Sequence, residues 1–168
     1  MKYLPLLLLI ILAACGPNTS HSSGQHEDSV DNNSAPLQVR PIQGYFVRNT
    51  VKQNDSVTCW VISSPEEKDS ILAPAKTMTN VVDTFDFANE IVTAVQLRPS
   101  DLTQDVQLTS AMVTEDEVHL HFAIRADTPK RSFTAAALWM GAFPRTPDVK
   151  SIRFYSGDKL LRTMRVAE

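Results

Sequence analysis

Short apolar or alternating runs, separated by turn-forming residues, recur from about residue 43 to the end of the chain. Runs of this length and spacing predict β-strands packed as a sandwich or barrel. We therefore expect a mainly β domain, a single antiparallel β-sandwich or partly open barrel with one short helix. The predicted strands are a stretch around Tyr45 to Val47, then Val57 to Ile62, Glu90 to Leu97, Val106 to Val113, Val118 to Ile124, Ile152 to Tyr155 and Lys159 to Val166.

Turn-forming residues between these runs predict how the strands pair. Asn54-Asp55-Ser56 leads into the strand that holds Cys59, so the strand around Tyr45 is expected to pair with it. Thr114-Glu115-Asp116-Glu117 is the polar turn of the clearest hairpin. Ser156-Gly157-Asp158 closes a terminal hairpin, in which Gly157 supplies the positive φ that such turns need.

One segment has a strong helix start, and another is ambiguous. In Ser64-Pro65-Glu66-Glu67 the serine is the expected N-cap, Pro65 the first helical residue and Glu67 the closing member of a capping box. The helix must be short because it ends before Pro74. The stretch from Phe133 to Phe143 is apolar without a period, so helix and buried strand compete there. We favour a strand.

The N-terminus combines one positive charge, at Lys2, with an apolar stretch from Leu4 to Leu12 that ends in Ala13-Ala14-Cys15. This stretch is far shorter than the roughly 20 residues that span a bilayer as a helix, so it is typical of a cleavable signal. Residues 12–15 resemble the bacterial lipobox. The resemblance implies a signal peptide over residues 1–14, cleavage before Cys15, and a diacylglyceryl thioether and an acyl group on Cys15. The alternative is an ordinary secretory signal.

Acyl chains on Cys15 would hold the protein at a lipid bilayer in the cell envelope. Gly16 follows the cysteine, and no aspartate is present there to indicate retention at an inner membrane, so we favour the outer membrane. Residues 15–37 are polar and poor in large apolar side chains, which predicts a flexible tether. His21 and His26 lie in it as solvated residues. Residues 38–168 are expected to form one globular domain.

The formal net charge of the chain is −3, and three of its acidic residues, Glu27, Asp28 and Asp31, lie in the predicted tether. The predicted domain is therefore close to neutral and has no stripe of basic and aromatic residues, which argues against nucleic-acid binding. No glycine-rich phosphate loop can be written through its glycines, so no nucleotide cofactor is expected. A serine hydrolase elbow is also absent from the sequence, and we predict no enzymatic activity.

Two groups of residues could carry chemistry. Cys59 alternates with Val57 and Val61 on one strand face, which predicts a buried core thiol and not a nucleophile. In the strand Glu117-Val118-His119-Leu120-His121, the carboxylate and both imidazoles share one face. Zinc would accept this ligand set, but the same residues are more typical of the solvent face of a hairpin, and we assign no metal to them.

Residues 82–87, Val-Asp-Thr-Phe-Asp-Phe, lead into the strand from Glu90 to Leu97 and follow the Ser-Pro-Glu-Glu helix start. This passage resembles the PrcB-like C-terminal domain family of bacterial lipoproteins. The resemblance implies a role in assisting or regulating an envelope protease, and it carries over no catalytic residues. The family's glycine-rich segment after the strand is replaced here by residues 98–102.

Two functions from different classes follow from the sequence. The first is a non-enzymatic module that binds an envelope protein, by strand addition at a sheet edge or through an exposed apolar patch with Trp60 or Trp139. The second is a metal-dependent enzyme or metal-binding protein that uses His119 and His121. A purely structural spacer would lack such a patch.

Overall fold

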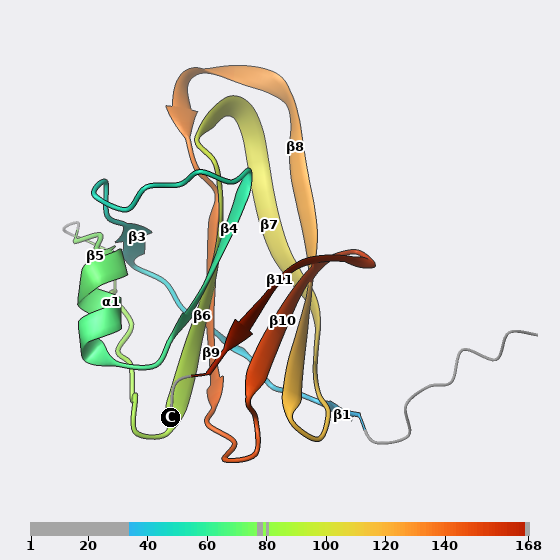
Figure 1. The fold of residues 1–168 in the computed structure, drawn as a ribbon. Helices are drawn as coiled ribbons and strands as arrows, with labels where there is room; N and C mark the ends of the chain where they lie inside the picture. The colour runs from blue at the N-terminus through green and yellow to red at the C-terminus, as the bar shows by residue number, and fades with distance from the viewer. Residues whose placement is uncertain (1–33, 77–78, 80, 167–168) are drawn as a thin grey trace, which may run out of the picture. The chain divides into compact units, whose positions relative to one another are not determined.

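The computed structural model describes residues 34–166 except residues 77–78 and 80. This described part is mainly β with one short helix, as predicted (Figure 1). Its elements in chain order are β1 (Ala35–Pro36), β2 (Arg40–Pro41), β3 (Tyr45–Val47), β4 (Val57–Ile62), α1 (Pro65–Ile71), β5 (Leu72–Pro74), β6 (Glu90–Leu97), β7 (Ser100–Val113), β8 (Glu117–Ala135), β9 (Leu138–Pro144), β10 (Ser151–Ser156) and β11 (Lys159–Arg165).

One long, bent hairpin builds both halves of the sandwich. β6 continues into β7 through Arg98-Pro99, and β8 continues into β9 through Ala136-Ala137. β7 pairs with β8 in a five-stranded sheet of order β1-β7-β8-β10-β11, whereas β6 pairs with β9 in a four-stranded sheet of order β2-β9-β6-β4. The hairpin therefore passes from one sheet to the other where it bends, at the top of Figure 1.

The main core lies between the two sheets. Alternate residues of β8 and β10 point inward, and Leu120, Ile152 and Phe154 have no exposed surface. They pack with inward residues of β4, β6 and β9, among them Cys59, Ile91 and Val95. Period-two alternation in the sequence therefore encodes this half of the core.

The other face of the four-stranded sheet is also covered. Leu72 of β5 and Val47 of β3 pack there against Val92 and Met140. Phe85 and Phe87, which follow α1 in the chain, pack against the same cluster. β6 consequently has neighbours on both faces, and every residue from Ile91 to Leu97 is buried. A strand that is buried on both faces is mostly apolar, which is why Glu90 to Leu97 could be recognised as a buried strand despite Thr93 and Gln96.

Two details of strand pairing differ from the expectation. The prediction that the strand around Tyr45 pairs with the Cys59 strand is wrong, because β3 pairs with β5 and β4 pairs with β6. β3 leaves the plane of the sheet to help cover its second face. The sheets are otherwise antiparallel, but β10 runs parallel to β8. The loop over residues 145–150 crosses from β9 in one sheet to β10 in the other, so β10 enters in the direction of β8.

Several local predictions are confirmed. Ser64 is the N-cap of α1, and its Oγ accepts a hydrogen bond from the Glu67 amide at 3.2 Å. The Glu67 carboxylate reaches one residue further back than in a standard capping box and accepts from the Ser63 amide at 2.7 Å. Gly157 has φ +56° in the terminal hairpin. Residues 133–135 and 138–143 are strand, in β8 and β9, and no helix forms there.

The paired structure begins inside the stretch that we expected to be tether. Ala35 pairs with Val113 and Pro36 with Met112 at the edge of β7, and β2 then pairs with Gly141 and Ala142 of β9. Residues 35–41 therefore join the edges of the two sheets on one side of the sandwich. The predicted signal peptide, Cys15 and the tether up to residue 33 lie outside the described residues.

Candidate functional site

The structure places the candidate residues Glu117, His119 and His121 on the outer face of the five-stranded sheet. Their neighbours Val118, Leu120 and Phe122 are buried in the core at 0 to 1% exposure, so the predicted alternation is confirmed. β10 lies beside β8 in parallel register, with Ser151, Arg153 and Tyr155 opposite Glu117, His119 and His121 in that order. Six polar or aromatic side chains thus share one surface, which we call the β8–β10 face.

Glu117 is the centre of the polar contacts on this face. Its Oε1 accepts hydrogen bonds from Ser151 Oγ at 3.0 Å and from Arg153 Nη2 at 2.9 Å. The phenol of Tyr155 and the carboxylate of Glu117 raise the pKa of Arg153 above its usual value. The carboxylate is therefore occupied by partners from the neighbouring strand.

Tyr155 stacks on both imidazoles. Its ring centroid lies 4.5 Å from that of His121, with the rings 6° from parallel, and 5.7 Å from that of His119. His121 Nδ1 is 3.0 Å from the carbonyl oxygen of Gly157. Because a carbonyl only accepts, this contact places a proton on Nδ1 of His121. The terminal hairpin thereby fixes the orientation of that ring.

The three candidate metal ligands do not converge. Glu117 Oε2 and His119 Nε2 are 3.5 Å apart, but His121 is turned towards Gly157. Among the described residues, no group of three or more histidine, cysteine, aspartate or glutamate side chains has a geometry that could hold a metal ion. What the face offers chemically is hydrogen-bonding and stacking groups that are already engaged with one another.

Cys59 is a core thiol, as the strand pattern predicted. It is 8% exposed and belongs to the cluster between the sheets, with Val57 and Val61 packed beside it. Burial raises the pKa of Cys59 to about 12, and the positive charge of Arg162 offsets only part of this effect. The thiolate that a nucleophilic cysteine needs is therefore scarce at neutral pH.

Sequence reasoning missed a second feature, the two unbridged sheet edges on the side of the sandwich opposite residues 35–41. β4 and β11 are the edge strands of their two sheets, and they face each other there without pairing. A groove of about 280 Å³ lies between them, lined by residues 55–59 from the β4 side and by Leu161 and Arg162 from β11. We call this feature the open side.

Basic residues gather along β11 and at its end. Lys159, Arg162 and Arg165 follow one another at intervals of three, and none forms an ion pair within the described part. A cleft of about 520 Å³ at the end of β11 is lined by Arg165 together with Arg145 and Lys150 of the β9–β10 loop. The spacing was visible in the sequence, but the edge position of the strand was not.

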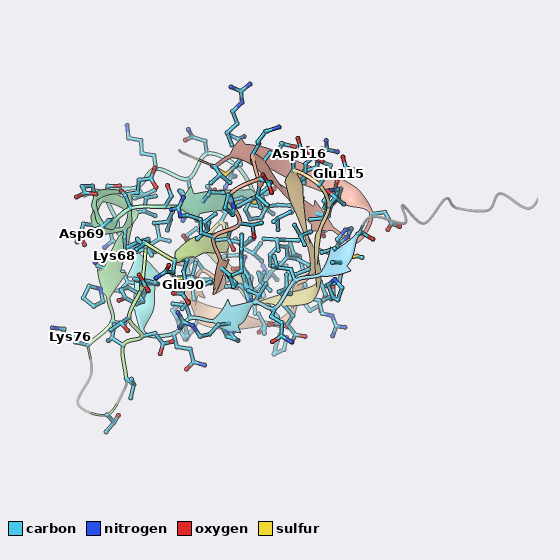
Figure 2. The ribbon with its side chains drawn as sticks, turned by 90° about the horizontal axis from the view of Figure 1, so that it is seen from below. Lys68, Asp69, Lys76, Glu90, Glu115 and Asp116 are labelled. Carbon is cyan, nitrogen blue, oxygen red and sulfur yellow. The ribbon has the colours of Figure 1, made fainter. Side chains whose placement is uncertain are left out.

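Some cations of the cleft already have partners. Arg145 donates to the carbonyl oxygens of Ser63 and Phe87 at 3.2 and 3.5 Å. Lys150 Nζ lies 3.5 Å from Asp116 Oδ2, and Asp116 is seen beside Glu115 at the β7–β8 turn in Figure 2. Arg162 and Arg165 therefore differ from Arg145 and Lys150, because no hydrogen bond or ion pair engages their guanidinium groups within the described part.

Comparison with protein-family models, curated proteins and solved structures found no match. The resemblance to the PrcB-like family and to the lipobox therefore stays a prediction. No helix in the described part of the chain is long and apolar enough to cross a membrane.

The two tryptophans do not form the apolar patch that we considered. Trp60 packs against the cluster under α1, and Trp139 packs edge-on against Phe122 at 4.9 Å. The large apolar side chains that are exposed lie on four separate segments of the described chain. These residues are Phe46, Val81, Phe133 and Leu160. The free edge of β11 is thus a better candidate for binding than an apolar surface.

Proposed function

We propose that the chain is a bacterial envelope lipoprotein, anchored through acylated Cys15, whose β domain is a non-enzymatic module that binds a protein partner. The lipobox-like residues 12–15 support the anchor, and Gly16 favours the outer membrane. A polar segment between Cys15 and the first paired strand gives the domain reach from the bilayer.

One observation carries the binding proposal, namely the unpaired outer edge of β11. This strand runs over seven residues at the margin of a five-stranded sheet. An edge of this length offers a row of backbone donors and acceptors to a further strand. Proteins use such edges to bind extended segments of other chains. The opposite side of the sandwich is bridged by residues 35–41, which pair with two residues of β7 and two of β9.

The side chains with reactive groups also support a binding role over a catalytic one. Cys59 is buried with its pKa raised, and Glu117 already accepts two hydrogen bonds from Ser151 and Arg153. A catalytic base or nucleophile has to face a site where substrate can approach. The β8–β10 face offers stacked rings and paired charges instead.

A pull-down from detergent-solubilised envelope tests the binding proposal. The affinity tag should be inserted within residues 16–33 and not after Glu168, because Val166 lines the cleft at the end of β11. We expect the lipidated chain to recover one protein reproducibly and in near-equal amount. The Cys15→Ala variant should recover less of it from intact envelopes. If the folded, membrane-bound chain recovers no protein above an untagged control, the binding proposal fails.

A further inference from the structure

We infer that the partner contributes an extended, acidic segment, which adds as a strand to the free edge of β11 and places carboxylates against Arg162 and Arg165. The inference rests on the proposed function, because it names the chemistry of the partner. It draws on three observations: the unpaired backbone of the open side, the placement of the two arginines, and the surplus of positive charge.

The backbone of the open side lacks strand partners on two elements. Among the described residues, β11 pairs only with β10, and β4 pairs only with β6. In each edge strand, about half of the backbone N–H and C=O groups point away from the sheet. The groove of about 280 Å³ lies between these two edges, with Val57 to Cys59 on one wall and Leu161 and Arg162 on the other. A strand added to β11 would satisfy part of this row of groups.

The two arginines lie on opposite faces of the edge. Arg162 pairs with Phe154, which is fully buried, so its side chain belongs to the inner face of the sheet. Arg165 pairs with Ser151, whose side chain is on the outer face beside Glu117. Cross-strand partners share a face. An added strand would therefore meet one arginine on each face.

This placement specifies the sequence of the segment. Side chains of a strand alternate between faces, so residues three apart point to opposite faces. Carboxylates three residues apart would match Arg162 and Arg165. The irregularity in the pairing of β11 with β10 puts Lys159 on the same face as Arg162, so the three-residue interval does not extend to Lys159. The ligand class is thus an extended peptide with two acidic residues three positions apart. An acidic side chain or chain terminus beyond Arg165 would enter the cleft of about 520 Å³ with Arg145 and Lys150.

An edge can also carry inward-facing charge only to prevent aggregation. In that role Arg162 would repel any added strand, acidic or not. The two roles differ in one measurable property, which is selective affinity for an extended acidic peptide.

The test uses the full lipidated chain in detergent micelles and a fluorescent peptide, Glu-Thr-Val-Glu-Thr-Val-Glu, with blocked ends. Fluorescence anisotropy should show saturable binding that weakens with salt, because the contacts are charged. The peptide with glutamine in place of glutamate should bind at least roughly tenfold more weakly. Hydrogen exchange at the β11 amides should slow when the acidic peptide is bound.

Charge reversal separates specific docking from general attraction. Arg162→Glu and Arg165→Glu should each weaken binding of the acidic peptide by roughly tenfold. Arg125→Glu is the matched control, because Arg125 is an exposed arginine of β8 away from the open side. It should leave the affinity unchanged. A lysine version of the peptide should bind the doubly reversed chain better than it binds the wild-type chain.

The inference is overturned if the acidic and glutamine peptides bind equally, or if Arg125→Glu weakens binding as much as Arg162→Glu does. Edge protection alone would give no saturable peptide binding. The envelope pull-down keeps the two proposals apart. If Arg162→Glu recovers the same protein in the same amount as the wild type, the partner exists but uses another surface. If neither bait recovers a partner, the proposed function itself fails.

Discussion

Arg153 and Glu117 are 36 residues apart in the chain, and they meet across the parallel strands β10 and β8 with Nη2 2.9 Å from Oε1. The contact ties the terminal hairpin to the long bent hairpin on their outer face. Ser151 adds a second hydrogen bond to the same oxygen. Parallel pairing of these strands brings all three residues together, so the contact reports directly on that register.

A double-mutant cycle should detect this contact. We expect Glu117→Ala and Arg153→Leu each to lower the urea midpoint of unfolding, and the double variant to lose less than the two single losses together. The Lys130–Asp101 pair is the control, because its side chains are 69 and 46% exposed against 39 and 23% for Arg153 and Glu117. Its coupling should be smaller. Equal coupling in the two pairs would contradict the parallel register on this face.

Two phenylalanines on the same strand should differ sharply in their contribution to stability. Phe122 is 1% exposed and packs against Trp139 and Phe154, whereas Phe133 is 62% exposed. We expect Phe122→Ala to lower the free energy of unfolding by about 3–5 kcal/mol. Phe133→Ala should change it by about 0.5 kcal/mol or less. Similar losses, measured by urea unfolding of the two variants, would place the core elsewhere.

Alkaline pH should lower the stability of the folded chain through the buried thiol of Cys59. Burial raises the pKa of Cys59 from its ordinary value of 9.0 to about 12. The stability that depends on the protonated thiol is therefore complete below pH 9 and is lost as pH rises towards 12. Urea unfolding at pH 8 and pH 10 should show a fall that is shallower in Cys59→Ala. Tyr45, whose pKa burial also raises, contributes in the same direction in both chains.

The same burial predicts low reactivity of Cys59. At pH 8 a thiol reagent should label it slowly in the folded chain and quickly in denaturant. Rapid labelling of the folded chain, with unfolding excluded by circular dichroism, would contradict the buried position.

Zinc distinguishes the binding proposal from the metal alternative. His121 is directed to the Gly157 carbonyl and away from the Glu117–His119 pair. We therefore expect wild-type protein and the His119→Ala/His121→Ala variant to take up the same amount of zinc in equilibrium dialysis. The comparison cancels any contribution of His21 and His26, which both proteins keep. Loss of one equivalent in the variant would favour the metal-binding function.

Local signals in the sequence were sufficient for many elements of the fold. Alternation identified β8 with Val118 and Leu120 inside and His119 outside, because it depends on the strand alone. The Ser64 cap and the Gly157 turn are likewise set by a few adjacent residues. These features do not depend on which other segment lies next to them.

Features that depend on distant segments were not predictable in this way. β3 pairs with β5 because α1 returns the chain to it, and β10 runs parallel to β8 because the chain changes sheets between Pro144 and Ser151. The open side requires knowing that β4 and β11 are both edges. Without that topology, the spacing of Lys159, Arg162 and Arg165 could not be interpreted as positive charge along a sheet edge.

The proposed envelope function depends on the chain being anchored at a membrane through Cys15. The intact mass of the mature protein, purified from the membrane fraction of a bacterial host, tests this most directly. The account predicts a chain that begins at Cys15 and carries the added mass of a diacylglyceryl group and an acyl chain, with Cys15→Ala unmodified and absent from that fraction. A wild-type chain with an unmodified Cys15 that fractionates away from membranes would contradict it.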